Sequence, residues 1–275
     1  MKVVKYITVA LFLIGTSTTT IGQEKAAELF RVPLSSPNSP GKLELDQVAG
    51  SIKVTGYDGN EVVVAATFGG NKGHRRSKDR SSSNNGMKRI ANSSLDVSAE
   101  EKNNVVRLSN GQVNKVVNFE IQVPRKFGLK LSTVNNGDIH VVGVDGEMEI
   151  SNVNGEITLE EVSGSASADT VNGDVTVGFV SITEDTPMAF SSLNGDLEIT
   201  FPKNVKAHIK AKSDQGLIYT DFDMKVADKK PVVKKNSSGS VYQIKVEKWV
   251  RGDINGGGAE MLFKTFNGDI FVKSR

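Results

Sequence analysis

A short turn recurs along this chain and constrains its fold more than any other feature. The copies at Gly137, Gly155 and Gly173 are equally spaced, and weaker copies at Gly146 and Gly164 fall halfway between them. Self-similarity at a fixed period is typical of chains that stack one small unit on the next. The copies are Asn136-Gly137-Asp138-Ile139, Asn154-Gly155-Glu156-Ile157, Asn172-Gly173-Asp174-Val175, Asn194-Gly195-Asp196-Leu197 and Asn267-Gly268-Asp269-Ile270.

Apolar residues alternate on both sides of each turn, which predicts short strands with one buried face. Val153, Ile157 and Leu159 flank Gly155, and the equivalents in the other copies include Val171, Leu193 and Phe266. Asn-Gly also begins tight hairpins, so a meander that closes as a barrel or sandwich is one alternative. Because the apolar positions recur at the same phase, we expect an all-β fold, namely a β-solenoid or β-helix of about 18 residues per coil with Asn-Gly-Asp/Glu turns.

Stacked turns have a consequence for their side chains. Asn136, Asn154 and Asn172 would lie about 4.8 Å apart and form an amide ladder. Acids would form a second column, which should face solvent or hold a cation because like charges repel at this spacing. Its expected members are Asp138, Glu156, Asp174 and, after a longer coil, Asp196.

The segment 1–22 has the pattern of a secretory signal peptide. Lys2 and Lys5 precede an apolar run from Ile7 to Gly15, followed by small residues up to Gly22. The alternative is a membrane-anchoring helix, although the run is shorter than the roughly 20 residues that span a bilayer. With no cysteine there is no disulfide framework and no lipidated N-terminal cysteine. We therefore expect export to the periplasm, cell envelope or extracellular space, without a transmembrane segment after the signal is removed.

Beyond the signal, we expect a linker over 23–40 and one domain over 41–275, with loop insertions at about 69–93 and 223–240. Without the signal, 32 basic residues balance 32 acidic ones, so no nucleic-acid partner is expected. The segment from Lys72 to Arg89 contains seven basic residues and a single acid, Asp79. They form either a contact for an anionic polymer or a solvated insertion.

Several segments together resemble the bacterial putative-adhesin domain of unknown function, over roughly residues 40–275. The resemblance rests on Val123-Pro124 followed by Leu129-Lys130-Leu131-Ser132-Thr133, on the serial turns, and on a glycine run before the copy at Asn267. It implies an exported, solenoid-like protein with an adhesin name that rests on shape, and it brings no catalytic residues.

No catalytic, cofactor or metal residue is assigned from the sequence. The acids Asp138, Glu156 and Asp174 have the spacing that a glycosidase needs, but their repetition favours a turn role. Calcium between coils remains an alternative, although calcium-binding nonapeptides contain more glycine than these turns. Three scattered histidines and no cysteine argue against zinc. The glycine run after Asn255 lacks the Lys-Ser/Thr of a phosphate loop.

We expect an exported, non-catalytic envelope or surface protein that presents a repetitive sheet face to an envelope polysaccharide or a surface protein. The alternative is a carbohydrate-active β-helix enzyme, either a polysaccharide lyase or a hydrolase. That enzyme would need a non-repeating carboxylate cluster in a groove beside Trp249 or Tyr219. A purely structural role without a ligand is the third reading, and the sequence does not specify an oligomeric state.

Overall fold

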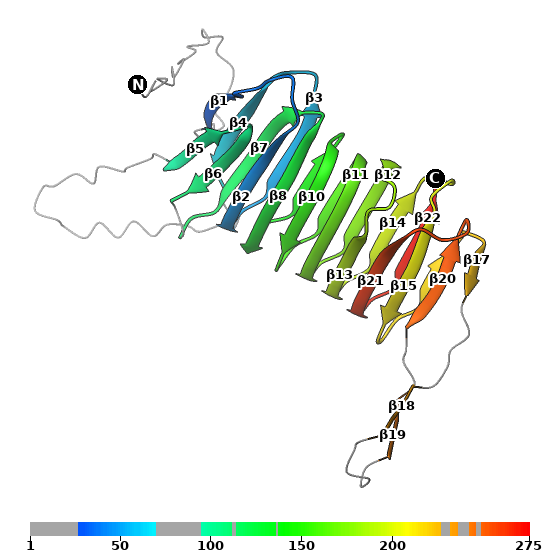
Figure 1. Cartoon of the computed structure of the whole chain (residues 1–275). Coiled ribbons are helices and arrows are strands. Elements are labelled where there is room, and N and C mark those ends of the chain that lie inside the picture. The colour runs from blue at the N-terminus through cyan, green and yellow to red at the C-terminus, as the bar shows by residue number, and fades with distance from the viewer. Residues whose placement is uncertain are drawn as a thin grey trace, which may run out of the picture.

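The computed structural model describes residues 27–69, 95–111, 114–135, 137–226, 232–235, 242–245 and 249–275. The expected signal peptide, the basic segment and Asn136 lie outside these residues. Twenty strands form one mixed sheet, and β18 (Val232–Lys235) and β19 (Tyr242–Lys245) form a separate antiparallel pair. Figure 1 shows the strands of the large sheet side by side in a long row.

The large sheet is bent over, so that two layers face each other across one apolar core. The long strand β11 (Ile157–Asn172) crosses between them, with its first residues in the second layer and the rest in the first. In spatial order the first layer contains β5 (Val97–Lys102), β6 (Val105–Asn110), β2 (Gly41–Ala49), β8 (Phe127–Asn135), β10 (Asp145–Asn152), β11, β13 (Met188–Asn194), β21 (Ala259–Asn267), β15 (Ala207–Ser213), β20 (Val250–Ile254) and β17 (Met224–Val226). The second contains β1 (Ala27–Pro33), β4 (Glu61–Phe68), β7 (Val117–Pro124), β3 (Ile52–Tyr57), β9 (Ile139–Val142), β11, β12 (Val175–Ile182), β14 (Leu197–Phe201), β22 (Ile270–Ser274) and β16 (Ile218–Thr220).

A strand of the first layer, a turn and a strand of the second layer make one unit, which we call a rung. Neighbouring rungs pair in parallel through both layers, and Ile139, Ile157 and Val175 lie in register across three of them. The turns are equally spaced along the chain only in these three rungs. Val175 next pairs with Leu197, and Leu197 pairs with Ile270.

Rungs near both ends of the stack do not follow the order of the chain. In the first layer the rung 41–57 lies between β6 and the rung 127–142. In the second layer it lies between β7 and the same rung 127–142. The rung 259–274 lies between the rungs 188–201 and 207–220, so the last part of the chain is inserted into the stack. In Figure 1 the red strands β21 and β22 accordingly lie between yellow-green and yellow ones.

The expectation of a β-solenoid or β-helix with coils of equal length is therefore wrong. The protein is all-β, but its mixed sheet is folded into a flattened, nearly closed, barrel-like shell. Antiparallel strands β1, β4 and β5 border one end, and β17 and β20 border the other. The physical reason is that a turn motif determines the local strand–turn–strand geometry, whereas packing determines which rungs become neighbours.

The core lies between the two layers and holds the aliphatic and aromatic side chains of alternate strand positions. Phe179 stacks on Phe201 with ring centroids 5.3 Å apart, and Phe190 stacks on Phe263 at 5.6 Å. Phe263 also meets Phe201 edge-on at 6.4 Å. Because Phe263 belongs to the inserted rung, this aromatic cluster joins residues far apart in sequence.

Candidate binding surface at the turn edge

Glycine turns connect the two layers along one edge of the stack, which we call the turn edge. Each glycine faces the glycine of the next rung at very close range. A Cβ added at Gly195 would lie 2.0 Å from the carbonyl oxygen of Gly173, and one at Gly173 would lie 2.1 Å from that of Gly155. The backbone approach therefore excludes any side chain here. In spatial order the column contains Gly50, Gly137, Gly155, Gly173, Gly195, Gly268 and Gly216.

In every rung from 127–142 to 207–220 a polar side chain bonds the glycine carbonyl of the preceding rung, and all of these side chains except Ser213 are buried. Thr170 donates to the oxygen of Gly155 at 3.0 Å, and Thr265 donates to that of Gly195 at 2.9 Å. These bonds satisfy carbonyl groups that the turn would otherwise leave unpaired. Equivalent bonds are made by Thr133, Asn152, Ser192 and Ser213.

Asparagine side chains form the amide ladder that the sequence predicts, with one change of register. Asn172 Nδ2 donates to Asn154 Oδ1 at 2.9 Å, and Asn154 Nδ2 donates to Asn135 Oδ1 at 3.1 Å. Thr133 pairs with Asn152, so Asn135 aligns with Asn154 and takes the position expected for Asn136. Asn194 and Asn267 continue the ladder at 2.8 and 2.7 Å.

The acids form the predicted second column on the other side of the glycines. Asp174 Oδ1 accepts the backbone N–H of Asp196 at 2.8 Å, and Asp196 Oδ1 accepts that of Asp269 at 2.7 Å. Asp138, Glu156, Asp174 and Asp196 are exposed. Within the described ranges no group of three or more acids, histidines or cysteines has metal-binding geometry. The repeated bonds give the carboxylates of Asp138, Asp174 and Asp196 a common role in joining turns.

One apolar row on the outer face was missed by the sequence argument. Val171, Leu193 and Phe266 were expected on the buried face, yet they are 37%, 47% and 44% exposed. Each precedes a ladder asparagine and points away from the core. The pairing registers align the row in the order Val48, Val134, Val153, Val171, Leu193, Phe266.

The row is long and narrow. Six positions at the strand spacing of about 4.8 Å extend roughly 24 Å, and the next outward positions along each strand lie about 7 Å away. The exposed strip is therefore about one side chain wide. A stable protein–protein interface buries about 800 Å² on each partner, which is several times the area of such a strip. Its shape fits a single extended chain rather than a globular surface.

Other residues singled out in the sequence lie apart from one another. His140 Nε2 lies 3.4 Å from Glu160 Oε2, and His208 Nδ1 lies 2.6 Å from Asp253 Oδ1. Tyr219 stacks on Phe271 with centroids 5.0 Å apart, and Lys210 lies over Trp249 at 5.2 Å. The structure does not bring these groups to one centre.

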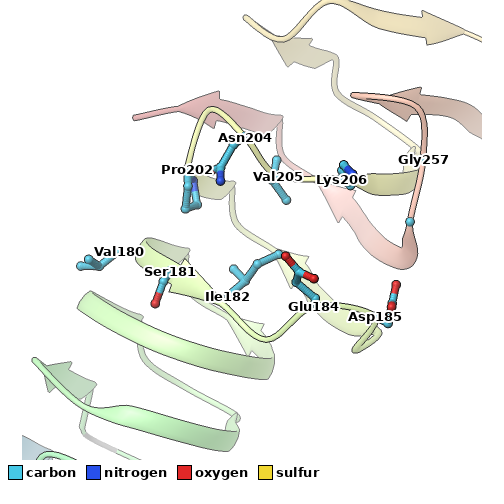
Figure 2. A pocket seen from close by; sticks show the side chains of 11 residues that line it. Val180, Ser181, Ile182, Glu184, Asp185, Pro202, Asn204, Val205, Lys206 and Gly257 are labelled. Atoms are coloured by element: carbon cyan, nitrogen blue, oxygen red, sulfur yellow. The ribbon is translucent and has the colours of Figure 1, made fainter.

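The opposite edge, where loops connect successive rungs, carries a cleft of about 590 Å³. Figure 2 shows the 180–185 segment on one side and the 202–206 segment on the other, with Gly257 beside the latter. Neither Trp249 nor Tyr219 lines this cleft. The groove that the enzyme alternative requires beside those aromatics is therefore not formed here.

Two solvent-exposed ion pairs shift the pKa values of their own members. A hydrogen bond from Arg125, and then its positive charge, holds the pKa of Asp58 below the ordinary value, and the same bond raises the pKa of Arg125. Glu149 likewise raises the pKa of Lys130, first through a hydrogen bond and then through its charge. Both pairs are solvent-exposed, so they contribute little to folding.

Comparison with known proteins agrees with the family resemblance. Residues 129–255 match the family model described as Toastrack DUF4097. No curated protein matches the chain. Among the described residues no helix is long and apolar enough to cross a membrane.

Two solved structures are similar at low identity. One is a putative cell adhesion protein from Clostridium sporogenes, with 13% identity, a TM-score of 0.42, and coverage of 92% of this chain and 100% of the other. The second is a putative adhesin from Bacteroides fragilis, with 12% identity, a TM-score of 0.33, and coverage of 92% and 98%. At these scores neither likeness decides what this chain does.

Proposed function

We propose that this chain is an exported, non-catalytic adhesion module of the cell envelope that binds an extended glycan along the turn edge. The observation that carries the proposal is the exposed apolar row beside the amide ladder. Sugar rings offer apolar faces to such a row, and an extended β-linked glycan advances per sugar by about one strand spacing. Amide groups of the ladder keep one donor hydrogen free at Asn172, Asn194 and Asn267.

Many weak, equal contacts suit a periodic ligand. Once one sugar is held, its neighbours are presented to the following rungs at high effective concentration, which raises the affinity for a polymer over that for its monomer. The turn carboxylates support a non-catalytic role, because Asp138, Asp174, Asp196 and Asp269 each accept a backbone N–H of the neighbouring turn. A catalytic pair would instead consist of two carboxylates in different environments.

Co-sedimentation of the exported chain with insoluble envelope polysaccharides tests the proposal. We expect Val171→Ser combined with Leu193→Ser to weaken polymer binding at least tenfold while the melting temperature stays nearly unchanged, because both side chains are exposed. Val180→Ser is the matched control, since Val180 is 49% exposed at the loop edge. Equal binding by the double variant and the wild type, or no binding to any polymer, would contradict the proposal. Turnover of a polysaccharide would instead support the enzyme alternative.

A further inference from the structure

The cleft at the loop edge has the size and composition of a small-ligand site. Its volume of about 590 Å³ falls within the roughly 300–1,000 Å³ of known ligand pockets. Val180, Ile182, Pro202 and Val205 provide apolar surface, and Val205 is buried. A cleft with apolar surface and a few convergent polar groups is the usual form of such a site.

Opposite charges face this cleft from its two sides. Glu184 and Asp185 lie in the loop after β12, and Lys206 lies in the loop before β15. Figure 2 shows both acids rising from one segment toward the side that carries Val205 and Lys206. All three are exposed, and none forms an ion pair with another described residue. The cleft therefore separates unpaired charges of opposite sign.

The Lys206 side is held in place before any ligand arrives. Asn255 Nδ2 donates to the carbonyl oxygens of Lys203 and Val205 at 2.9 and 2.8 Å. A Cβ at Gly258 would lie 2.4 Å from the carbonyl oxygen of Lys206, so these two segments are in close backbone contact. A preformed side reduces the ordering that binding would otherwise require.

We propose that this cleft binds a short peptide zwitterion. The ligand ammonium lies against Glu184 and Asp185, its carboxylate lies against Lys206, and small apolar side chains cover Val180 and Ile182. An extended dipeptide spans about 7 Å, so its ammonium and carboxylate are far enough apart to meet different groups of the cleft. A purely anionic ligand would meet the two acids, and a purely cationic one would leave Lys206 unpaired.

Calorimetric titration of the exported chain with L-alanyl-L-alanine tests the site. The comparison ligand is the same dipeptide with an acetylated N-terminus and an amidated C-terminus, and the dipeptide amide tests the ammonium alone. We expect the free dipeptide to bind at least tenfold more tightly than either derivative. Lys206→Gln, and Glu184→Gln combined with Asp185→Asn, should each weaken its binding at least fivefold. Lys203→Gln, in the same loop but outside the cleft, should leave it unchanged.

Four outcomes would overturn the proposal. The first is no binding of the dipeptide at 10 mM, a concentration that corresponds to a binding free energy of about −2.7 kcal/mol if it were the Kd. The second and third are binding of the blocked dipeptide, or of the dipeptide amide, as tight as that of the free dipeptide. The fourth is an affinity of the Lys206→Gln variant for the dipeptide equal to that of the Lys203→Gln variant. Equal binding of the amide would identify a site for amines only. Because the substituted side chains are exposed, equal melting temperatures will show that each variant is folded. The site is independent of the turn edge, so either proposal can fail while the other stands.

Discussion

The two edges of the stack connect the same strands in different ways. At the turn edge the five rungs with an Asn-Gly-Asp/Glu turn repeat one set of contacts, made by a buried hydroxyl or amide, the glycine, an asparagine and the acid. At the loop edge the connections 183–187, 202–206 and 255–258 share no such pattern, and they surround a cleft. Repetition creates a long surface suited to a polymer, whereas irregular connections create a local pocket. The difference between the edges can be measured by matched substitutions.

The largest difference in stability between matched variants should come from substituting a glycine of the turn column. Gly195→Ala places a Cβ 2.0 Å from the carbonyl oxygen of Gly173, so neighbouring turns must separate. We expect a loss of about 3 kcal/mol in the free energy of unfolding. Gly178→Ala is the control, because its Cβ would meet nothing closer than 3.9 Å and the change should be about 0.5 kcal/mol or less. Urea denaturation measures both, and equal losses would show that the glycine column is not special.

A smaller effect is expected from the buried hydroxyl of Thr265, which is fully buried and donates to the Gly195 oxygen. Thr265→Val keeps the shape but leaves that carbonyl without this donor, at a cost of about 2 kcal/mol. Thr176→Val, on the exposed face of β12, should change stability by less than about 0.5 kcal/mol. A neutral Thr265→Val variant would mean that the hydroxyl column is dispensable.

The amide ladder should contribute less, because its members are exposed. Asn194→Ala removes one bond to Asn172 and one from Asn267, and we expect about 1 kcal/mol of destabilisation. Asn204→Ala, at the cleft, provides the loop-edge counterpart with no change in thermal unfolding. If both variants melt alike, the ladder contributes nothing measurable to stability.

The smallest effect concerns pH at the Asp58–Arg125 pair. The pKa of Asp58 is lowered from its ordinary 3.8 in the folded state. The stabilisation is therefore complete above pH 3.8 and is lost as the pH falls through the lower folded-state pKa. Asp58→Asn should lower the melting temperature slightly at pH 5, and the decrease should be smaller below pH 3.8, where the carboxylate becomes protonated. High salt should reduce the difference, since the pair is exposed. A difference that grows on acidification would contradict this assignment.

The sequence predicted the local geometry because that geometry depends on neighbours along the chain. Alternation around Gly155 and Gly173, and the ladder of Asn154 with Asn172, both follow from a turn repeated at equal spacing. The copy at Asn267 gives the same local signal wherever its rung lies. Its position depends on Phe263 packing with Phe190 and Phe201, which no local pattern reveals. The solenoid prediction failed at this point.

The candidate surfaces were harder to predict. Val171 and Leu193 alternate like core residues, and only the change of layer at the glycine places them outside. The turn itself was the available signal, because a residue two positions before the glycine belongs to a different layer from one two positions after it. The cleft had no sequence signal, since its three segments are unrelated and far apart in the chain.

The inserted rung 259–274 also determines how the fold bears mechanical load. A terminal rung at the end of a stack is held along one side and can be peeled off by force. Here β21 lies between β13 and β15, and β22 lies between β14 and β16. A force that pulls this segment out must break hydrogen bonds along two seams in each layer and withdraw Phe263 from its aromatic neighbours. The last strands therefore resist removal from the stack, which is the mechanical property that the proposed adhesive role would require.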